Sequence, residues 1–330
     1  MTQVVRPVKL QLGPVEVDVP VFFLSVSSVK TALSPLDYVR LLNAMSALNG
    51  QFLISAFDLN FLNNIESAVV KQELVHAREK GIAVLMDSGN YESFWKGARF
   101  NWVQADFHRV VKEFPCPVAF GFDEQQPPDD LDSHLRLIIE RYRQDQAAAG
   151  TTTIIPIIHG APAVLPNLCA EVAEISNMSM IAVPERRLGD GVFERAKTVS
   201  AIRHALDAKG RYVGLHLLGT GNPISMALYS IVGADSFDGL EWCQTVVDHE
   251  SALLFHLSQA DFFTAQTRWG REGWPFHPTV LAHNIEFYSD WTKRLRIAIH
   301  DGKGTEFCRR NFPRRVFVQC ATALGWEGAV

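Results

Sequence analysis

Short apolar runs alternate with longer stretches of helical periodicity along most of this 330-residue chain, and this alternation restricts its fold more than any other feature. The apolar runs are continuous and rich in β-branched and aromatic residues, as in parallel strands that are covered on both faces. Eight such units favour an α/β fold of the (β/α)8 (TIM) barrel type over an open doubly wound sheet, which usually has fewer strands. The predicted strands are 21–26, 52–57, 82–86, 117–122, 153–158, 179–183, 212–218 and 234–237, and the predicted helices are 34–48, 65–80, 102–113, 131–148, 164–176, 192–208, 223–231 and 284–300.

The clearest single unit spans residues 211–242. An apolar run breaks at a Gly-Thr-Gly turn, after which Asn222 offers a helix N-cap oxygen and Pro223 suits the first helical position. A short second strand then ends in the carboxylate Asp238. The carboxyl ends of barrel strands are where the active sites of such folds lie, so this unit places an acid where chemistry is expected.

Two regions fall outside the repeat. Residues 240–282 are too long for an ordinary connection between a strand and its helix, and we interpret them as an inserted subdomain. Residues 301–330 form a tail, and residues 293–315 contain eight Lys or Arg against two acids. This bias fits either a solvated surface or a polyanion site. No composition break divides the chain, so we expect one barrel domain, 1–330, with this insertion and basic tail.

Composition excludes several classes of protein. The net charge of −5 provides no overall attraction to nucleic acid or anionic membranes, so a polyanion would need a local basic patch. The N-terminus has no apolar leader, and the apolar runs are too short to span a bilayer. The five cysteines are scattered without a CxxC pair. This pattern predicts reduced thiols in a cytoplasmic protein, without a disulfide framework or a thiolate metal site.

Polar side chains collect where the predicted strands end. Any one of them alone is explained equally well as a helix N-cap. Together they predict a site at one end of the barrel, because packing would favour apolar residues there. Several carboxylates around one pocket suit cleavage at an acetal-like carbon, in which one carboxylate is the nucleophile and another handles the proton. The residues are Asp87, Asp123, His159, Glu185 and Asp238.

Six short segments at these strand ends resemble motifs of the tRNA-guanine transglycosylases, in the same order along the chain. These enzymes are barrels that excise guanine from nucleic acid and insert a 7-deazaguanine. Each match is short, and their order and position carry the resemblance. LMDSGNY (85–91) is similar to the family's DSGG(Y/F)Q, GFDE (121–124) to FDE, PIIHG (156–160) to GI(V/Q)QG, IAVPE (181–185) to LAVGE, LLGTG (217–221) to LMGVG, and GADSFD (233–238) to G(I/V)DMFD.

The resemblance implies catalytic roles for two residues. Asp238 would attack C1′ of the sugar and form a covalent glycosyl intermediate, and Asp87 would be the general acid and base. No cofactor is implied by this chemistry.

The resemblance also implies a base pocket. Asp123 would accept from N1–H and the amino group of guanine. Tyr91 and Leu218, with the neighbouring Gly219, would hold the base between them. His159 and the backbone near Ala182 would read the carbonyl face of the base. Glu185 would line the pocket near its 7-substituent.

Several positions depart from the family pattern. Asn90 replaces a glycine, Glu92 a glutamine and Gly239 a cysteine, and Leu-Glu-Trp-Cys follows where the family has a loop that contacts tRNA. The family's CxCxxC zinc ligands are absent, although His283 resembles the last ligand. His249, His256 and His277 could rebuild a metal site with His283, but without thiolates we expect scattered histidines and no metal.

The departures fall in parts that grip tRNA, whereas the base pocket is kept. We therefore expect a DNA-acting relative that inserts a 7-deazaguanine such as preQ0, with a helper protein opening the duplex and with Arg309, Arg310, Arg314 and Arg315 holding phosphates. Three alternatives remain. They are a tRNA-acting enzyme, a non-catalytic partner subunit, and an unrelated barrel such as a small-molecule lyase.

Overall fold

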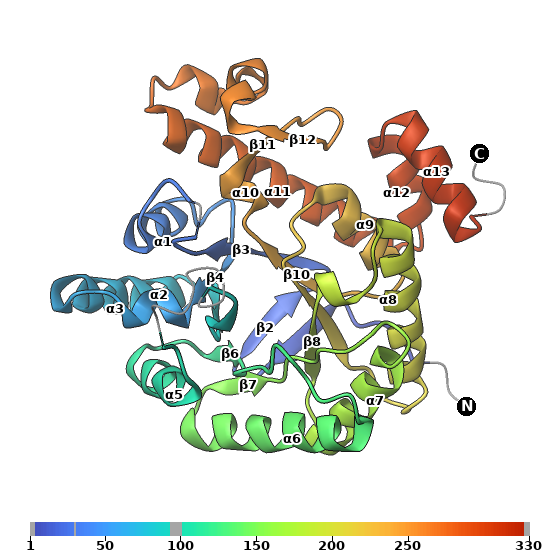
Figure 1. The fold of residues 1–330 in the computed structure, drawn as a ribbon. Coiled ribbons are helices and arrows are strands. Elements are labelled where there is room, and N and C mark those ends of the chain that lie inside the picture. Colours follow the sequence, from blue (N-terminus) through green and yellow to red (C-terminus); the bar gives the residue numbers. More distant parts are fainter. Residues whose placement is uncertain (1–3, 30, 93–100, 327–330) are drawn as a thin grey trace.

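The computed structural model describes residues 4–29, 31–92 and 101–326 and shows a nearly closed barrel of eight parallel strands surrounded by helices (Figure 1). The strand order runs from β3 through β7 on one side and from β3 through β10 and β9 to β8 on the other. This architecture confirms the α/β, TIM-like barrel expected from the sequence. The strands are β3 (Val21–Val26), β4 (Gln51–Ser55), β5 (Ala83–Asp87), β6 (Val118–Phe120), β7 (Thr153–Ile155), β8 (Met180–Pro184), β9 (Gly214–Leu218) and β10 (Ser236–Gly239).

The sheet closes into a barrel at a seam between its two edge strands, β7 and β8. Beyond the end of β7, Ile158 N–H donates to the carbonyl of Ala182 at 2.8 Å, and Ala182 N–H donates to the carbonyl of Pro156 at 3.0 Å. These two hydrogen bonds join the edges of the sheet, so the carboxyl ends of all eight strands surround a single opening.

Four of the helices that cover the barrel, α1 (Pro35–Ala44), α3 (Asn64–Glu79), α6 (Leu131–Ala148) and α9 (Pro223–Ile231), begin at a residue whose side chain caps the helix. Asn222 accepts from the backbone N–H groups of Ile224 and Ser225 at 3.1 and 3.2 Å, and Pro223 is the first residue of its helix. Apolar side chains of the helices pack on the outward faces of the strands and form the larger core. The other covering helices are α5 (Gln104–Glu113), α7 (Leu165–Ser176), α8 (Val192–Asp207) and α11 (Phe276–His300).

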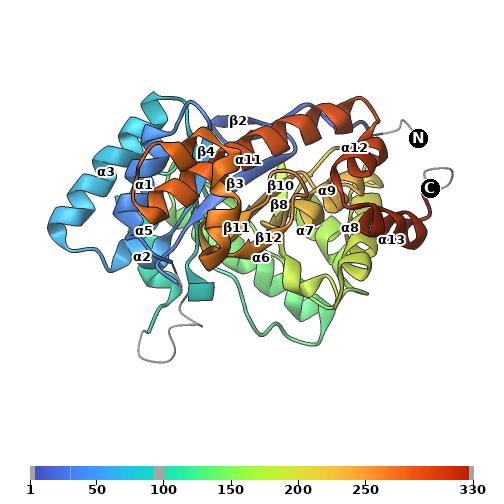
Figure 2. The same cartoon turned by 90° about the horizontal axis from the view of Figure 1, so that it is seen from above.

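A hairpin that the sequence analysis did not assign closes the amino end of the barrel. It consists of β1 (Lys9–Leu12) and β2 (Val15–Asp18), and it lies at the end opposite the carboxyl ends of the strands (Figure 2). Leu10 and Val17 are buried together with Phe23 and Phe120 of the barrel interior. Only the carboxyl end of the barrel is therefore left to hold a ligand.

Two boundaries differ from the sequence-based expectation. The strand predicted over 52–57 ends at Ser55, and α2 (Ala56–Asn60) begins there. The helix predicted from residue 284 begins at Phe276, because Pro278 falls in its first turn, where a proline costs no hydrogen bond. The segment between β10 and α11 is correspondingly shorter than 240–282. It contains α10 (Glu241–Gln244), β11 (Thr245–Val247), β12 (Leu254–His256) and the 3₁₀ turns Leu257–Phe262, Thr264–Gln266 and Arg268–Arg271.

The basic C-terminal segment is helical rather than an extended tail. It forms α12 (Gly304–Asn311) and α13 (Arg314–Leu324), which pack against α9 and α8 on the outer wall of the barrel (Figures 1 and 2). Among the described residues no helix has the length and apolar character needed to cross a membrane. All five cysteines are buried and free of disulfides.

Candidate active site

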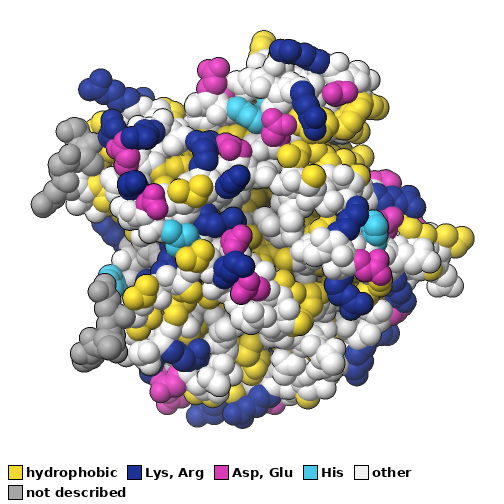
Figure 3. Space-filling model, turned by 180° about the vertical axis from the view of Figure 1, so that it is seen from behind, with side chains coloured by type: hydrophobic (Ala, Val, Ile, Leu, Met, Phe, Trp, Pro, Cys, Tyr) yellow, Lys and Arg dark blue, Asp and Glu magenta, His cyan; other side chains and the backbone are white. Residues whose placement is uncertain are grey.

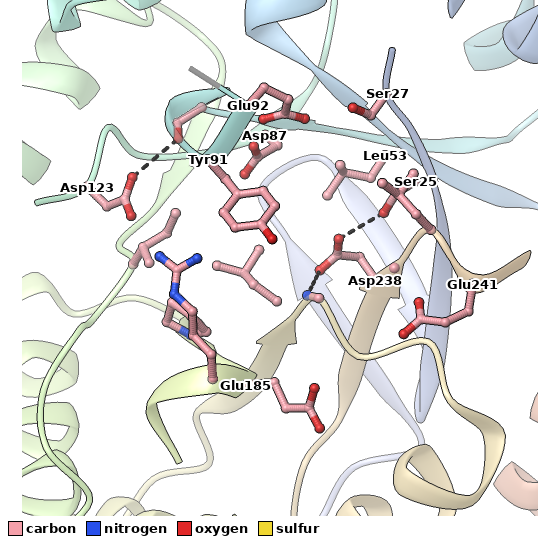
Figure 4. A pocket seen from close by; sticks show the side chains of 18 of the residues that line it. Ser25, Ser27, Leu53, Asp87, Tyr91, Glu92, Asp123, Glu185, Asp238 and Glu241 are labelled. Atoms are coloured by element: carbon pink, nitrogen blue, oxygen red, sulfur yellow. Dashed lines mark hydrogen bonds between the residues drawn. The ribbon is translucent and has the colours of Figure 1, made fainter. Parts of the chain in front are cut away.

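A cavity of about 320 Å³ opens at the carboxyl end of the barrel and is rich in carboxyl groups (Figure 4). Seven of the residues expected to form a site line it together, although they come from strand ends far apart in the sequence. They are Asp87, Tyr91, Asp123, Glu185, Leu218, Gly219 and Asp238. The sequence analysis assigned no role to four charged side chains that also line it, namely Glu92, Arg186, Arg195 and Glu241.

Asp238, at the end of β10, is held by three hydrogen-bond donors. Its Oδ2 accepts from the hydroxyl of Ser25 at 2.8 Å, and its Oδ1 accepts from Gly219 N–H at 3.0 Å. The Nε2 of His216 lies 3.1 Å from Oδ1. These three partners fix the orientation of the Asp238 carboxyl group, which lines the cavity.

His216 is a part of the site that the sequence analysis missed. It is fully buried in β9, and its Nδ1 lies 2.7 Å from the hydroxyl of Ser236. A neutral ring with its proton on Nε2 satisfies both contacts, since Nδ1 then accepts from Ser236 while Nε2 donates to Asp238. A histidine in an otherwise apolar strand, directly before the LLGTG motif, was the only signal available in the sequence.

Asp87, at the end of β5, is an acid of the cavity whose pKa is raised by its surroundings. Burial raises its pKa well above the usual range, and the charges of Glu92, Asp238 and Asp123 raise the pKa further. A hydrogen bond from Gly89 N–H to its Oδ2, at 3.0 Å, acts in the opposite direction. Gly89 has a φ of +76°, which only glycine adopts readily, and a Cβ at this position would lie 2.4 Å from the backbone nitrogen of Phe57. Asp87 is therefore protonated where an ordinary aspartate would be ionised.

Two further acids of the cavity hold protons near neutral pH. Burial raises the pKa of Glu92 to about 7, with a contribution from the charge of Asp58. Burial also raises the pKa of Glu241 to about 7, and the charges of Glu185 and Asp238 add to this shift. The sequence analysis treated Glu92 only as a departure from a motif and gave Glu241 no role, because neither ends a strand.

Glu241 explains the glycine that follows Asp238. A Cβ on Gly239 would lie 2.3 Å from Oε2 of Glu241, and a Cβ on Gly221 would lie 2.2 Å from the same atom. The carboxyl group of Glu241 thus occupies the space beside both glycines. The replacement of the family's cysteine by Gly239 goes together with this additional acid.

The carboxylate of Asp123 accepts hydrogen bonds from side chains of the protein. Its Oδ2 is 2.5 Å from Nε2 of His159 and accepts from the amide of Gln125. The Nε of Arg187 donates to Nδ1 of His159 at 3.3 Å, which leaves the ring proton on Nε2 and makes His159 a donor to Asp123. Asn90, where the family has glycine, donates to the backbone carbonyl of Asp123 at 2.9 Å.

Two of the residues predicted to contact the base, His159 and Ala182, do not line the cavity. His159 is 2 % exposed and does not line the cavity, because it is turned to Asp123 and supports that side chain. Ala182 is fully buried, and both its N–H and its carbonyl are used in the seam between the sheet edges. Its backbone therefore has no free group for a ligand.

Tyr91 and Leu218, which were expected to hold a flat ring between them, both line the cavity, and Figure 4 shows the Tyr91 ring within it. Tyr91 is 43 % exposed. The guanidinium carbon of Arg186 lies 5.1 Å from the centre of the Tyr91 ring. Such a contact shows that the tyrosine offers its π-face to a cationic or flat partner.

Glu185 is paired rather than free. Its Oε1 lies 3.0 Å from Nη1 of Arg195 and accepts from the hydroxyl of Tyr229 at 3.0 Å. The pair lines one side of the cavity and presents little net charge there.

The histidines near the family's zinc position do not fit a metal site. Nε2 of His283 lies 2.7 Å from the carbonyl of Val247, and its Nδ1 lies 3.2 Å from the hydroxyl of Thr267. His249 stacks on His283 at 4.2 Å, and its Nε2 bonds to the carbonyl of His283. Within the described part of the chain no group of three His, Cys, Asp or Glu side chains is arranged to hold a metal ion.

The four arginines expected to hold phosphates lie away from the mouth. Arg309 and Arg310 on α12 both bond to Glu306, with the shortest contacts at 2.6 and 2.5 Å. Arg314 and Arg315 are the first two residues of α13 and are exposed. On the barrel face opposite the view of Figure 1, acidic and basic side chains are interspersed (Figure 3). The cavity's own cations, Arg186 and Arg195, are closer to any ligand in it.

No protein-family model matches the sequence, and no curated protein matches it.

Proposed function

We propose that this protein is a base-exchange transglycosylase that replaces a guanine in nucleic acid by a 7-deazaguanine. The observation that carries the proposal is the pairing of two aspartates in one cavity with opposite surroundings. Asp238 is held by three donors that suit a carboxylate, whereas Asp87 is buried among acids that keep it protonated. Two carboxyl groups in environments of this kind serve as nucleophile and proton donor.

The chemistry balances with these two residues alone. Asp238 attacks C1′ while the bond from C1′ to N9 of guanine breaks, and Asp87 gives its proton to N9. The products are a glycosyl ester of Asp238, neutral guanine and the Asp87 carboxylate. In the second half the incoming base loses its N9 proton to Asp87, N9 attacks C1′, and Asp238 is released.

In this proposal the purine binds in the cavity between Tyr91 and Leu218. The carboxylate of Asp123, which also lines the cavity, accepts hydrogen bonds from N1–H and the amino group of guanine. His159 and Arg187 support Asp123 from behind, which orients the carboxylate. Guanine binding would require the amide of Gln125 to leave Asp123 and the base to take over its hydrogen bond. Arg186 would move from the Tyr91 ring as the base stacks there.

The polymer that we propose is DNA. A base inside a duplex cannot enter a cavity at a barrel mouth, so the nucleotide must be extruded at a cost of a few kcal/mol, less where the strand is already open. Stacking on Tyr91 returns about 1–3 kcal/mol, which does not clearly offset the opening of a paired duplex. We therefore expect open or nicked DNA, or a helper protein, to promote the reaction.

Incorporation of labelled guanine tests the proposal directly. The purified chain should exchange radiolabelled guanine into single-stranded DNA faster than into a matched duplex, and preQ0 should then displace the label. Exchange into tRNA alone would assign the protein to the tRNA-acting enzymes. Exchange into neither polymer, with a folded protein, would contradict the proposed activity.

The basic helices provide a second prediction, about affinity. Each phosphate neutralised by Lys or Arg contributes roughly 0.7–0.9 to the slope of log affinity against log salt. If α13 holds the strand, Arg314→Glu with Arg315→Glu should flatten the slope by roughly 1.4–1.8 for two lost contacts, while free-base binding is unchanged. Acids in the first turn of a helix are favourable, so these changes should not unfold α13.

A matched control comes from α6, where Arg136 and Arg143 are also exposed. Reversal of this pair changes the net charge equally and should leave the slope nearly unchanged. Arg309 and Arg310 are better replaced by Gln, because reversal would place three acids on one turn around Glu306. Equal effects of the α13 and α6 pairs would contradict a specific role of the basic helices.

A further inference from the structure

Glu92 is a carboxyl group of the cavity that the proposed exchange does not use. It is 7 % exposed, and its Oε2 accepts no hydrogen bond from any residue that the structure describes. In Figure 4 it lies next to Asp87, and both side chains line the cavity. A buried acid without full hydrogen bonding is costly, so its presence beside the proton donor calls for a role.

The groups that face Glu92 come from four elements. Asp87 lies at the end of β5, and Asp58 lies on α2, where it accepts from the backbone N–H of Ser28 at 2.6 Å. The hydroxyls of Ser55, at the end of β4, and Ser27, after β3, favour the charged form of Glu92. Among the residues that the structure describes, the charged group that shifts the pKa of Glu92 is the acid Asp58, and the two hydroxyls act in the opposite direction.

We propose that Glu92 is a positioning residue that acts through Asp87, its carboxylate keeping on Asp87 the proton that the departing guanine needs. The inference rests on the proposed exchange. Above the pKa of Glu92, which is about 7, the two groups hold one proton between them. After burial, the charge of Glu92 is the strongest influence that raises the pKa of Asp87.

The proton balance of the cycle is unchanged by this role. Asp87 gives its proton to N9 of guanine and recovers one from N9 of the incoming base, and Glu92 neither gains nor loses a proton. The negative charge beside Asp87 also makes it a stronger base in the second half-reaction. One neighbour thus supports both proton transfers, which proceed in opposite directions.

The test is the pH profile of exchange by Glu92→Gln, which removes the charge and keeps the size of the side chain. Without that charge the pKa of Asp87 falls, so the loss of activity at high pH should begin at lower pH. At pH values above this limb, the activity of the variant relative to wild type should be lower by about tenfold for each pH unit by which the limb has moved. At pH values well below the limb, the activity of the variant should stay near the wild-type value. Glu92→Asp, which keeps a charge, should restore the limb at least in part.

Glu241→Gln is the matched control, because it removes the other cavity acid with a pKa of about 7 and Glu241 is not among the groups that raise the pKa of Asp87. Its high-pH limb should coincide with that of the wild-type protein. A limb in Glu92→Gln that also coincides with wild type, or a loss of activity equal at every pH, would overturn the role of Glu92.

Carbon-13 NMR of labelled aspartate carboxyl groups separates this inference from the proposed activity. The Asp87 signal, identified by its loss in Asp87→Asn, should titrate at lower pH in Glu92→Gln than in the wild-type protein. A shifted titration without any guanine exchange would reject the proposed activity but would support the effect of Glu92 on the pKa of Asp87. Exchange with an unshifted titration would reject the pair alone.

Discussion

Asp238→Asn is expected to abolish base exchange and the covalent adduct. An amide cannot attack C1′, and removal of the nucleophile costs about 10⁶-fold in kcat in a well-studied hydrolase, so a loss on that order is expected here. The measurement is the trapping of a protein–DNA adduct on denaturing gels, together with guanine exchange. The wild-type protein should form the adduct and Asp238→Asn should not.

The hydrogen bonds around Asp238 allow the loss of the nucleophile to be separated from a loss of folding. The amide oxygen of asparagine can still accept from Gly219 and His216, and its NH₂ group can donate to the hydroxyl of Ser25. The variant should therefore unfold at nearly the wild-type temperature. Near-normal exchange by the folded variant would refute the role of Asp238.

Asp87→Asn is expected to lower exchange by ~10²–10⁴-fold, the usual contribution of general acid–base catalysis. The variant should still bind guanine, since its side-chain oxygen can accept from Gly89 N–H as that of Asp87 does. In the wild-type protein, activity should be lost as the pH rises through the raised pKa of Asp87, because the acid must be protonated to release guanine.

DNA that contains 7-methylguanine provides the control for Asp87→Asn. This base already carries a positive charge on its ring, so it leaves C1′ without a proton from the protein. The variant should release 7-methylguanine with a much smaller deficit than guanine. An equal deficit with both bases would mean that Asp87 has a role other than proton donation.

The existence and order of the barrel strands were predictable because each is a continuous apolar run between helical segments. Boundaries were less predictable where one apolar run serves two elements. The run from Phe52 to Phe57 is apolar in both its strand and its helix part, so the start of α2 at Ala56 is not visible in the pattern. The hairpin at Lys9–Asp18 is short and half polar, so its pattern does not predict it. Its apolar residues are buried because they cover the end of the barrel.

Candidate site residues were predictable where a polar side chain interrupts the end of an apolar strand. Asp87, Asp123, Glu185 and Asp238 all carry this signal, and all line the cavity. Neither Glu92 nor Glu241 interrupts the end of an apolar strand. Their displaced pKa values arise from neighbours that the fold brings close, so no local pattern indicates them.

The sequence by itself determined the repeat of strands and helices and the acids at the strand ends, because apolar periodicity and the position of polar breaks are local properties of the chain. Only the tertiary structure decided what each group does within the cavity. His159 supports Asp123 instead of contacting a ligand, Ala182 uses its backbone to join the sheet edges, and burial beside Glu92 keeps Asp87 protonated. Hydrogen-bond partners and burial depend on residues that are distant in the chain and adjacent in space, which is why the fold had to be known first.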